Sequence, residues 1–165
     1  LDGAHSSVSR WLNALSLVYY HFEIKPFSNS IPRSLKKEGK FYLYDWSAIE
    51  NEGARFENLV ASHLLKMTHY YNDTGSADLS LHYLRNKEKK EVDFLILNKK
   101  KPLFTVEAKL NDLALDKNFE IFQSKINVPH FQIVSRQNVF RRFDLTKNKN
   151  YAYLISFDSF FDLLP

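Results

Sequence analysis

The sequence predicts an α/β domain of three layers, in which helices cover both faces of a mixed sheet. Apolar residues recur at helical spacing over 53–68 and again over 111–126. Between these segments, apolar and polar residues alternate with period 2 on both sides of a lysine-rich break at 99–101. Two apolar runs, at 130–135 and 151–156, then have the length of strands. The order helix, three strands, helix, strand, strand is typical of a mixed sheet between two helical layers.

The segment 53–68 is predicted to be a helix with one apolar side. Glu57 lies on the same stripe as Val60, Ala61 and Leu64 by the i, i+3, i+4, i+7 rule. A carboxylate on the buried side of a helix is costly unless a cation neutralises it. That cation is either a neighbouring side chain, such as Arg55 or a lysine, or a bound metal ion.

The two alternating segments are predicted to form an antiparallel hairpin with a five-residue connection centred on Lys100. In this register, residues equally far from Lys100 face each other. Asp93 then lies opposite Glu107, and Glu91 lies opposite Lys109, on one face of the hairpin. A connection of even length would send Asp93 and Glu107 to opposite faces. The other face is a core stripe of Val92, Phe94, Ile96, Phe104, Val106, Ala108 and Leu110.

The acidic face of this hairpin has the residue types of a site for Mg²⁺ or Mn²⁺. Asp93 and Glu107, joined by Glu57 from the helix, would hold the ion through hard carboxylate oxygens. The backbone carbonyl of Ala108 is a further candidate oxygen. The ammonium of Lys109 would position or help deprotonate a water and offset charge on a phosphate. A Glu-x-Lys tripeptide alone is weak evidence, but the shared face makes the pattern typical of a metal-dependent nuclease.

Three stretches of the chain resemble a known family, and they read FENLVASHLLK, HYLRNKEKKEVDFLIL and PLFTVEAKL. They are similar to the PD-(D/E)xK nuclease-like domain at the C-terminus of many bacterial and archaeal AAA-type ATP-binding proteins. The resemblance implies a restriction-endonuclease-like core whose metal site is formed by Glu57, Asp93, Glu107 and Lys109. Val92 stands where the name of the superfamily has proline.

The resemblance also implies a function. It implies a Mg²⁺- or Mn²⁺-dependent deoxyribonuclease that works with an ATPase module, with DNA as the expected substrate and RNA as a second option. The alternative is a catalytically inactive module of the same fold that binds nucleic acid or protein, and a third option is a structural domain with a relict site. The chain opens at Leu1 and its single methionine is Met67, so we expect a fragment of a longer protein.

Residues 1–50 are predicted to form an appendage, and residues 51–165 the nuclease-like domain. A helix is expected at 6–19, followed by strands at 20–25 and 40–45 that are joined by a polar, basic segment. This arrangement resembles the last helix and wing of a winged helix-turn-helix, which precedes the nuclease-like domain in the related ATPases. The alternative is a helix and hairpin that pack on the main domain or link it to the ATPase.

The basic residues predict where a polyanion would bind. The net charge is +4 and the pI is about 9.1, which suits a nucleic-acid partner without requiring one. The connection at 86–90 is expected at the metal-site end of the hairpin, and the turn at 99–101 at the other end. Phosphate contact and plain surface exposure are equally weighted for the arginine pair at 141–142. The candidate phosphate-binding residues are Lys87, Lys89, Lys90, Arg141 and Arg142.

Several function classes are excluded by what the sequence lacks. Without cysteine, neither disulfides nor thiolate metal sites can form. The six histidines lack zinc-ligand spacing, and the chain has no Gly-rich phosphate loop for ATP. No apolar run approaches the ~20 residues that cross a bilayer, and no secretory signal is found. We therefore expect a cytoplasmic protein without membrane contact, whose oligomeric state the sequence leaves open.

Three further expectations concern packing. Trp11 and Trp46 are expected in the core or between domains, and Gln123 at the boundary of the second helix. The ending FDSFFDLLP is expected to form a short closing helix.

Overall fold

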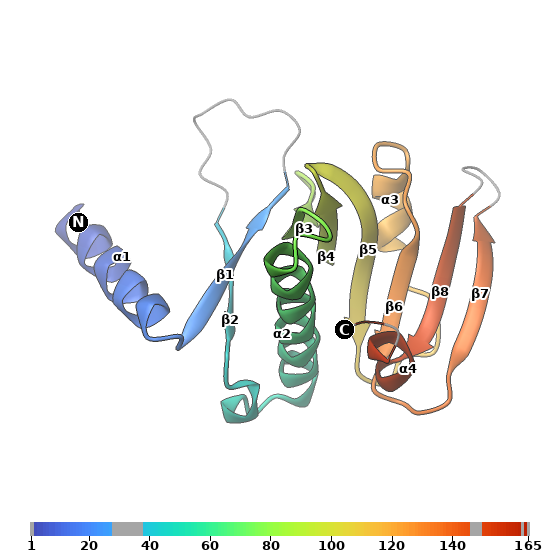
Figure 1. Cartoon of the computed structure of the whole chain (residues 1–165), viewed down its shortest axis with the longest axis horizontal. Coiled ribbons are helices and arrows are strands. Elements are labelled where there is room, and N and C mark those ends of the chain that lie inside the picture. Colours follow the sequence, from blue (N-terminus) through green and yellow to red (C-terminus); the bar gives the residue numbers. More distant parts are fainter. Residues whose placement is uncertain (1, 28–37, 146–149, 163, 165) are drawn as a thin grey trace.

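A computed structural model shows an eight-stranded mixed sheet with helices on both faces (Figure 1). It describes residues 2–27, 38–145, 150–162 and 164. The central strands β3, β4 and β5 are antiparallel, whereas β5, β6 and β8 are parallel. In sheet order the strands are β2 (Lys40–Leu43), β1 (His21–Pro26), β3 (Leu79–Arg85), β4 (Glu91–Asn98), β5 (Lys101–Lys109), β6 (His130–Val134), β8 (Asn150–Ser156) and β7 (Phe140–Leu145).

The helices divide between the two faces of the sheet and confirm the predicted three-layer α/β fold. On one face, α2 and α4 enclose a core with the central strands. On the other face, a second core includes residues of η2 and of the segment that follows α3. No helix in the described residues is long and apolar enough to cross a membrane. The helices are α1 (Asp2–Leu17), η1 (Trp46–Ala48), α2 (Glu52–Asp73), η2 (Lys117–Phe119), α3 (Glu120–Gln123) and α4 (Phe157–Phe161).

Helix α2 confirms the helix expected at 53–68 and is longer than predicted. It begins after Asn51, whose side-chain oxygen accepts a hydrogen bond from the Ala54 amide at 2.9 Å. Near its C-terminal end, Asn72 donates to the Leu79 carbonyl at 2.8 Å and accepts from the Leu79 amide at 2.6 Å. This pair of bonds ties the end of α2 to the start of β3 and so sets how the helix lies on the sheet.

The connection between β4 and β5 differs from the predicted five-residue loop. Asn98 pairs with Lys101, which leaves only Lys99 and Lys100 as a two-residue turn. Both have positive φ, at 49° and 65°, as the tight turn of a hairpin requires. A lysine at such a position costs more than glycine or asparagine would, and for that reason the composition did not predict the turn.

A bulge in β5 nevertheless restores the predicted register. Next to the turn the pairing shifts, and Leu103 is the additional residue in β5. Beyond it Ile96 faces Phe104 and Phe94 faces Val106, as the centre at Lys100 predicts. The even-length turn alone would have reversed the faces, and the one-residue bulge cancels that effect.

A second irregularity lies in β4 and changes the predicted core stripe. Between two regular pairs with β3, the two residues Asp93 and Phe94 oppose the single residue Tyr83. The alternation of side chains therefore shifts at this point. Val92, which was predicted to share a stripe with Phe94, packs in the second core with Leu95 instead.

The N-terminal hairpin is continuous with the main sheet. Strands β1 and β2 pair antiparallel, as predicted, and β1 also pairs in parallel with β3 through Lys25 and Pro26. Helix α1 confirms the expected helix and lies beyond this edge of the sheet (Figure 1). The polar connection with Pro32, Lys36 and Lys37 lies outside the described residues.

The helix predicted at 111–126 is mostly absent. The segment forms turns, then η2 and the four-residue α3. Asp112 accepts a hydrogen bond from the Ala114 amide at 2.8 Å, and Asp116 accepts from the Asn118 amide at 2.8 Å. Short acidic side chains that bind nearby amides favour turns and helix starts over a continuous helix. Gln123, expected at a boundary, is buried and donates to a backbone carbonyl at 3.0 Å.

The C-terminal strands follow the prediction except for β7. Strands β6 and β8 and the closing helix α4 lie where they were expected. The edge strand β7 was not predicted because most of its side chains are exposed and it lacks an apolar stripe.

Candidate functional site

The candidate site lies where β4 and β5 separate. Regular pairing of the two strands ends at Phe94 and Val106. Beyond that pair, the Asp93 amide donates to Glu107 Oε2 at 3.3 Å, and the Ala108 amide donates to Asp93 Oδ2 at 3.0 Å. Carboxylates thus take over the backbone donors that the parting strands leave free. The structure brings Asp93 and Glu107 together, as the sequence predicted.

Glu57 reaches the same region from α2. The hydroxyl of Tyr42, on β2, donates to Glu57 Oε1 at 2.7 Å, and the Tyr42 ring lies 5.7 Å from the ring of Phe94. Arg55, the alternative partner of Glu57, contacts Glu52 instead, with 3.8 Å between its guanidinium nitrogen and Glu52 Oε1. Glu57 is therefore oriented toward the strands rather than along its own helix.

Lys40 joins these acids, although no pattern in the sequence predicted it. Its Nζ atom lies 3.6 Å from Glu57 Oε1, 3.2 Å from Glu91 Oε2 and 3.5 Å from Asp93 Oδ1. The side chain comes from the first residue of β2, an element separate from α2 and far from β4 in sequence. Among the described residues, no three histidine or acidic side chains converge as a metal cage would require. In this arrangement the ammonium provides the positive charge shared by the three acids.

Lys109 lies on the other side of the strand fork. Its Nζ atom is 2.8 Å from Glu107 Oε1 and 3.1 Å from Asp116 Oδ2. The predicted opposition of Glu91 and Lys109 is wrong, because pairing between the strands ends before either residue. Besides its contact with the β2 lysine, Glu91 lies 3.0 Å from the Arg85 Nε atom.

A buried glutamine positions the loop that carries Asp116. Gln132, on β6, has an exposed fraction of 0%. Its amide nitrogen donates to the Asp112 carbonyl at 3.0 Å and to the Ala114 carbonyl at 2.8 Å, and its oxygen accepts from the Asp116 amide at 2.7 Å. Gln132 was not among the predicted site residues. The available signal was one polar side chain in the centre of the strand HFQIV.

The carboxylates of the site are held in an environment that opposes their charge. Burial, followed by the charges of Glu107 and Glu57, raises the pKa of Asp93 to about 8, although Lys40 opposes the change. Burial also raises the pKa of Glu107, against the contrary effect of Lys109. The two lysines therefore only partly compensate the burial and mutual repulsion of the carboxylates.

The basic groups show the complementary effect. Burial alone would lower the pKa of Lys40, but the charges of Asp93, Glu57 and Glu91 outweigh it and raise that pKa. Burial would also lower the pKa of Lys109. The hydrogen bonds and charges of Glu107 and Asp116 outweigh this effect and raise that pKa. Both lysines are therefore held as ammonium ions. These shifts and those of the acids describe a region of net negative potential.

The candidate phosphate-binding residues fall into two groups. The turn at 86–90 directly precedes β4, so it lies at the same end of the sheet as Asp93. Its three lysines, Lys87, Lys89 and Lys90, are exposed. The turn at Lys99 and Lys100 lies at the opposite end of the strands, as expected.

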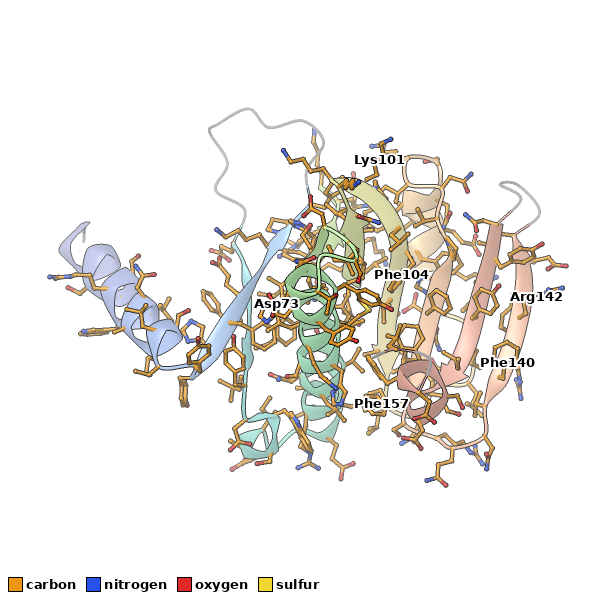
Figure 2. All side chains as sticks on the ribbon, in the orientation of Figure 1. Asp73, Lys101, Phe104, Phe140, Arg142 and Phe157 are labelled. Carbon is orange, nitrogen blue, oxygen red and sulfur yellow. The ribbon has the colours of Figure 1, made fainter. Side chains whose placement is uncertain are left out.

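The arginine pair lies on the far edge of the sheet. Arg141 and Arg142 belong to β7, which is separated from β5 by β6 and β8. Figure 2 shows Arg142 on this edge strand, away from α2. Its guanidinium lies 4.9 Å from the ring centre of Tyr151 and 3.6 Å from Asp144. The structure does not bring these arginines together with the acidic cluster.

Fold and site define a class of protein: an α/β domain in which a helix and two separating strands present acids and a lysine at one end of a mixed sheet. The chain belongs to the family described as Domain of unknown function (DUF4143), whose profile matches residues 52–154. The match begins at the first residue of α2 and contains Glu57, Asp93, Glu107 and Lys109.

One solved structure with a similar chain is a refined half-complex from the tetradecameric assembly of Thermococcus gammatolerans McrB AAA+ hexamers with bound McrC. The TM-score is 0.49 and the sequence identity 8%, over 64% of this chain. The chain spans 28% of the length of that one. No curated protein matches the sequence at a significant level.

Proposed function

We propose that this chain is a metal-dependent nuclease domain that hydrolyses DNA phosphodiester bonds as part of an AAA-type ATPase. The observation that supports the proposal most is the meeting of Asp93 and Glu107 at the strand fork, through hydrogen bonds of 3.3 Å and 3.0 Å to the two backbone amides. Glu57 approaches from α2, and Lys109 contacts Glu107. The link to an ATPase is supported by the sequence resemblance.

The donor chemistry fits Mg²⁺ or Mn²⁺. Asp93, Glu107 and Glu57 offer carboxylate oxygens, which these hard cations prefer, and the Ala108 carbonyl is a fourth candidate ligand. The raised pKa of Asp93 supports this assignment, because a cation would relieve the charge that the buried acids share. When bound, the ion would supply Lewis-acid stabilisation of the phosphate and a more acidic water.

Lys109 acts as a positioned cation in this proposal. Contacts of 2.8 Å to Glu107 and 3.1 Å to Asp116 hold its ammonium group in place. A charged lysine donates hydrogen bonds to a water or a phosphate oxygen and offsets negative charge there. Of the two roles expected from the sequence, positioning and charge compensation fit these contacts better than proton abstraction.

DNA would approach over the turn at 86–90. Lys87, Lys89 and Lys90 are exposed at the same end of the sheet as the acids. Contacts of lysine with phosphates are sequence-independent and weaken with salt. Such contacts would act equally on RNA, which remains the second candidate substrate.

The test is cleavage of supercoiled plasmid and of single-stranded DNA during titration with Mg²⁺ and Mn²⁺. Asp93→Asn and Lys109→Met should lower the rate at least about 100-fold, since each removes a group needed in the transition state. Asp158→Asn, on α4, and Lys66→Met, on α2, are matched controls because both residues are exposed and distant in the fold. Equal residual cutting by all four variants would indicate a contaminating nuclease and reject the proposal.

A second candidate function is a non-catalytic module for nucleic-acid or protein binding. The contacts of Lys40 with Glu57, Glu91 and Asp93 favour it, because they supply positive charge to the acids without a metal. A binding module of this kind should bind DNA in a salt-sensitive way, measured by fluorescence anisotropy in EDTA, and should show no metal-dependent cleavage. Absence of DNA binding at low salt would remove the nucleic-acid version of this candidate.

A further inference from the structure

We propose that Lys40 is a tethered cation that competes with the divalent metal for the acids of the site, so that the β1–β2 hairpin restrains metal binding. The inference rests on the proposed metal site and adds a control element to it. It concerns a residue outside the segment that the family profile matches.

The position of the ammonium group carries the inference. Lys40 Nζ lies within 3.6 Å of Glu57 Oε1 and 3.5 Å of Asp93 Oδ1, two carboxylates that the proposed metal also needs. Two cations that share the same ligand oxygens repel each other strongly in a partly buried site. Metal binding to Glu57 and Asp93 therefore disfavours this position of the lysine, and the lysine in this position weakens metal binding.

Glu91 is a salt-bridge partner that Lys40 can keep when the metal is bound. It makes the shortest of the three contacts, at 3.2 Å, and is not a proposed metal ligand. Arg85 holds the other Glu91 oxygen at 3.0 Å, so this carboxylate remains at the edge of the site. A displaced Lys40 would keep this partner while Glu57 and Asp93 become available.

The hairpin itself is anchored next to the site. The side chain of Asn58, on α2, accepts from the Leu43 amide at 2.8 Å and donates to the Leu43 carbonyl at 2.7 Å. Tyr42 adds its hydrogen bond to Glu57. Strand β2 thus delivers Lys40 to the acids from a fixed position, and only the flexible lysine side chain needs to move.

The experiment measures Mn²⁺ affinity by isothermal titration calorimetry, with no DNA present. Lys40→Met should raise the affinity at least about tenfold, because the competing charge is gone. Glu91→Gln should lower the affinity, since a displaced Lys40 would lose the partner that it keeps when the metal is bound. Lys25→Met is the matched control: this lysine lies on the same hairpin, is exposed and should leave the affinity unchanged. Asp93→Asn reports how much of the binding belongs to the site.

Thermal melting supplies a second readout. In EDTA, Lys40→Met should melt below the wild type, because three acids lose their cation. Addition of Mn²⁺ should raise its Tm more than that of the wild type. If Lys40→Met does not fold, Glu91→Gln carries the comparison.

The outcomes separate the inference from the proposed function. Asp93-dependent Mn²⁺ binding of equal strength in the wild type, Lys40→Met and Glu91→Gln would overturn the competition and keep the metal site. Weaker binding by Lys40→Met would also overturn it, because the lysine would then support the site. If neither the wild type nor the Lys40 and Glu91 variants bind Mn²⁺ through Asp93, both the competition and the proposed metal site are rejected.

Discussion

Asp93 shows how a single residue can serve a site at the expense of stability. Its carboxylate is buried beside Glu107 and receives hydrogen bonds and a lysine contact that only partly offset this environment. Strained or charged groups of this kind are commonly retained at functional sites. The folded protein therefore holds an acid that would ionise more readily in the unfolded chain.

We predict that Asp93→Asn stabilises the metal-free protein at high pH. The ionised acid is disfavoured in the fold, so wild-type stability should fall as the pH rises from the ordinary pKa of 3.8 to the raised pKa of about 8. Asparagine keeps the shape and the acceptor without the charge. Urea unfolding in EDTA at pH 5, 7 and 9 should show a growing advantage for the variant, of about 1 to 2 kcal/mol at pH 9. A variant that is less stable at all three values would contradict this account.

His130 produces the opposite dependence on pH. It is 1% exposed, its ring stacks on Phe119 at 4.1 Å, and its Nδ1 atom lies 3.0 Å from the Thr105 hydroxyl. Burial lowers its pKa from 6.5 to about 3. The imidazole is therefore neutral in the fold and takes up a proton more readily in the unfolded chain.

We predict that His130 destabilises the protein in acid. Stability should fall as the pH drops below 6.5, since the unfolded chain gains the proton first, and the fall should continue to about pH 3. His130→Gln should be less stable at pH 7 because it loses the ring stacking. Its further loss between pH 6.5 and 4, measured by urea unfolding, should be smaller than that of the wild type by about 1 to 3 kcal/mol. Identical losses in both proteins would reject this role.

At the scale of elements, the β4–β5 hairpin shows that a register can be predicted correctly for the wrong reason. The period-2 pattern requires Phe94 and Val106 on the core face, and this pairing is observed. The predicted pairing assumed an odd-length loop, whereas the chain uses a two-residue turn and the additional residue Leu103. The core pattern dictates the parity, and several local geometries can satisfy it.

We predict that deletion of Leu103 is tolerated, whereas deletion of Thr105 is not. Leu103 is the additional residue of the bulge, so its removal leaves Phe94 opposite Val106. The free energy of unfolding should then change by less than about 1.5 kcal/mol. Thr105 is a paired residue, and in the present register its removal would place Glu107 opposite Phe94 on the core face. That deletion should lower the free energy of unfolding by at least about 3 kcal/mol. Unfolding curves by circular dichroism test both, and losses of equal size would contradict the role of Leu103 as the bulge.

The segment 111–126 shows the limit of periodicity. Phe119 and Ile126, two of the apolar residues that recur at helical spacing over 111–126, are both buried, as that spacing predicts. The prediction of a continuous helix was wrong, because the side chains of Asp112 and Asp116 accept hydrogen bonds from backbone amides and interrupt the helix. Apolar spacing alone does not distinguish one long helix from turns that bury the same residues.

At the scale of the whole molecule, the N-terminal hairpin completes the site. It lies outside the segment that the family profile matches, yet β2 brings Lys40 and Tyr42 to the acids. Helix α1 beyond it leaves Trp11 66% exposed and contributes little to the packing of the sheet. The hairpin serves the core on the α2 face as well, since Phe22, Ile24 and Tyr42 are buried there.

The sequence by itself determined the three-layer class, helix α2, most of the strands and the meeting of Asp93 with Glu107. It could do so because the periods of helices and strands are local properties that place residues on faces. Only the tertiary structure decided the cation contacts, since Lys40 comes from a distant strand and no local period encodes that approach. The same holds for the support of Asp116 by Gln132, because a polar side chain buried in a strand finds its partners only when separate segments pack together.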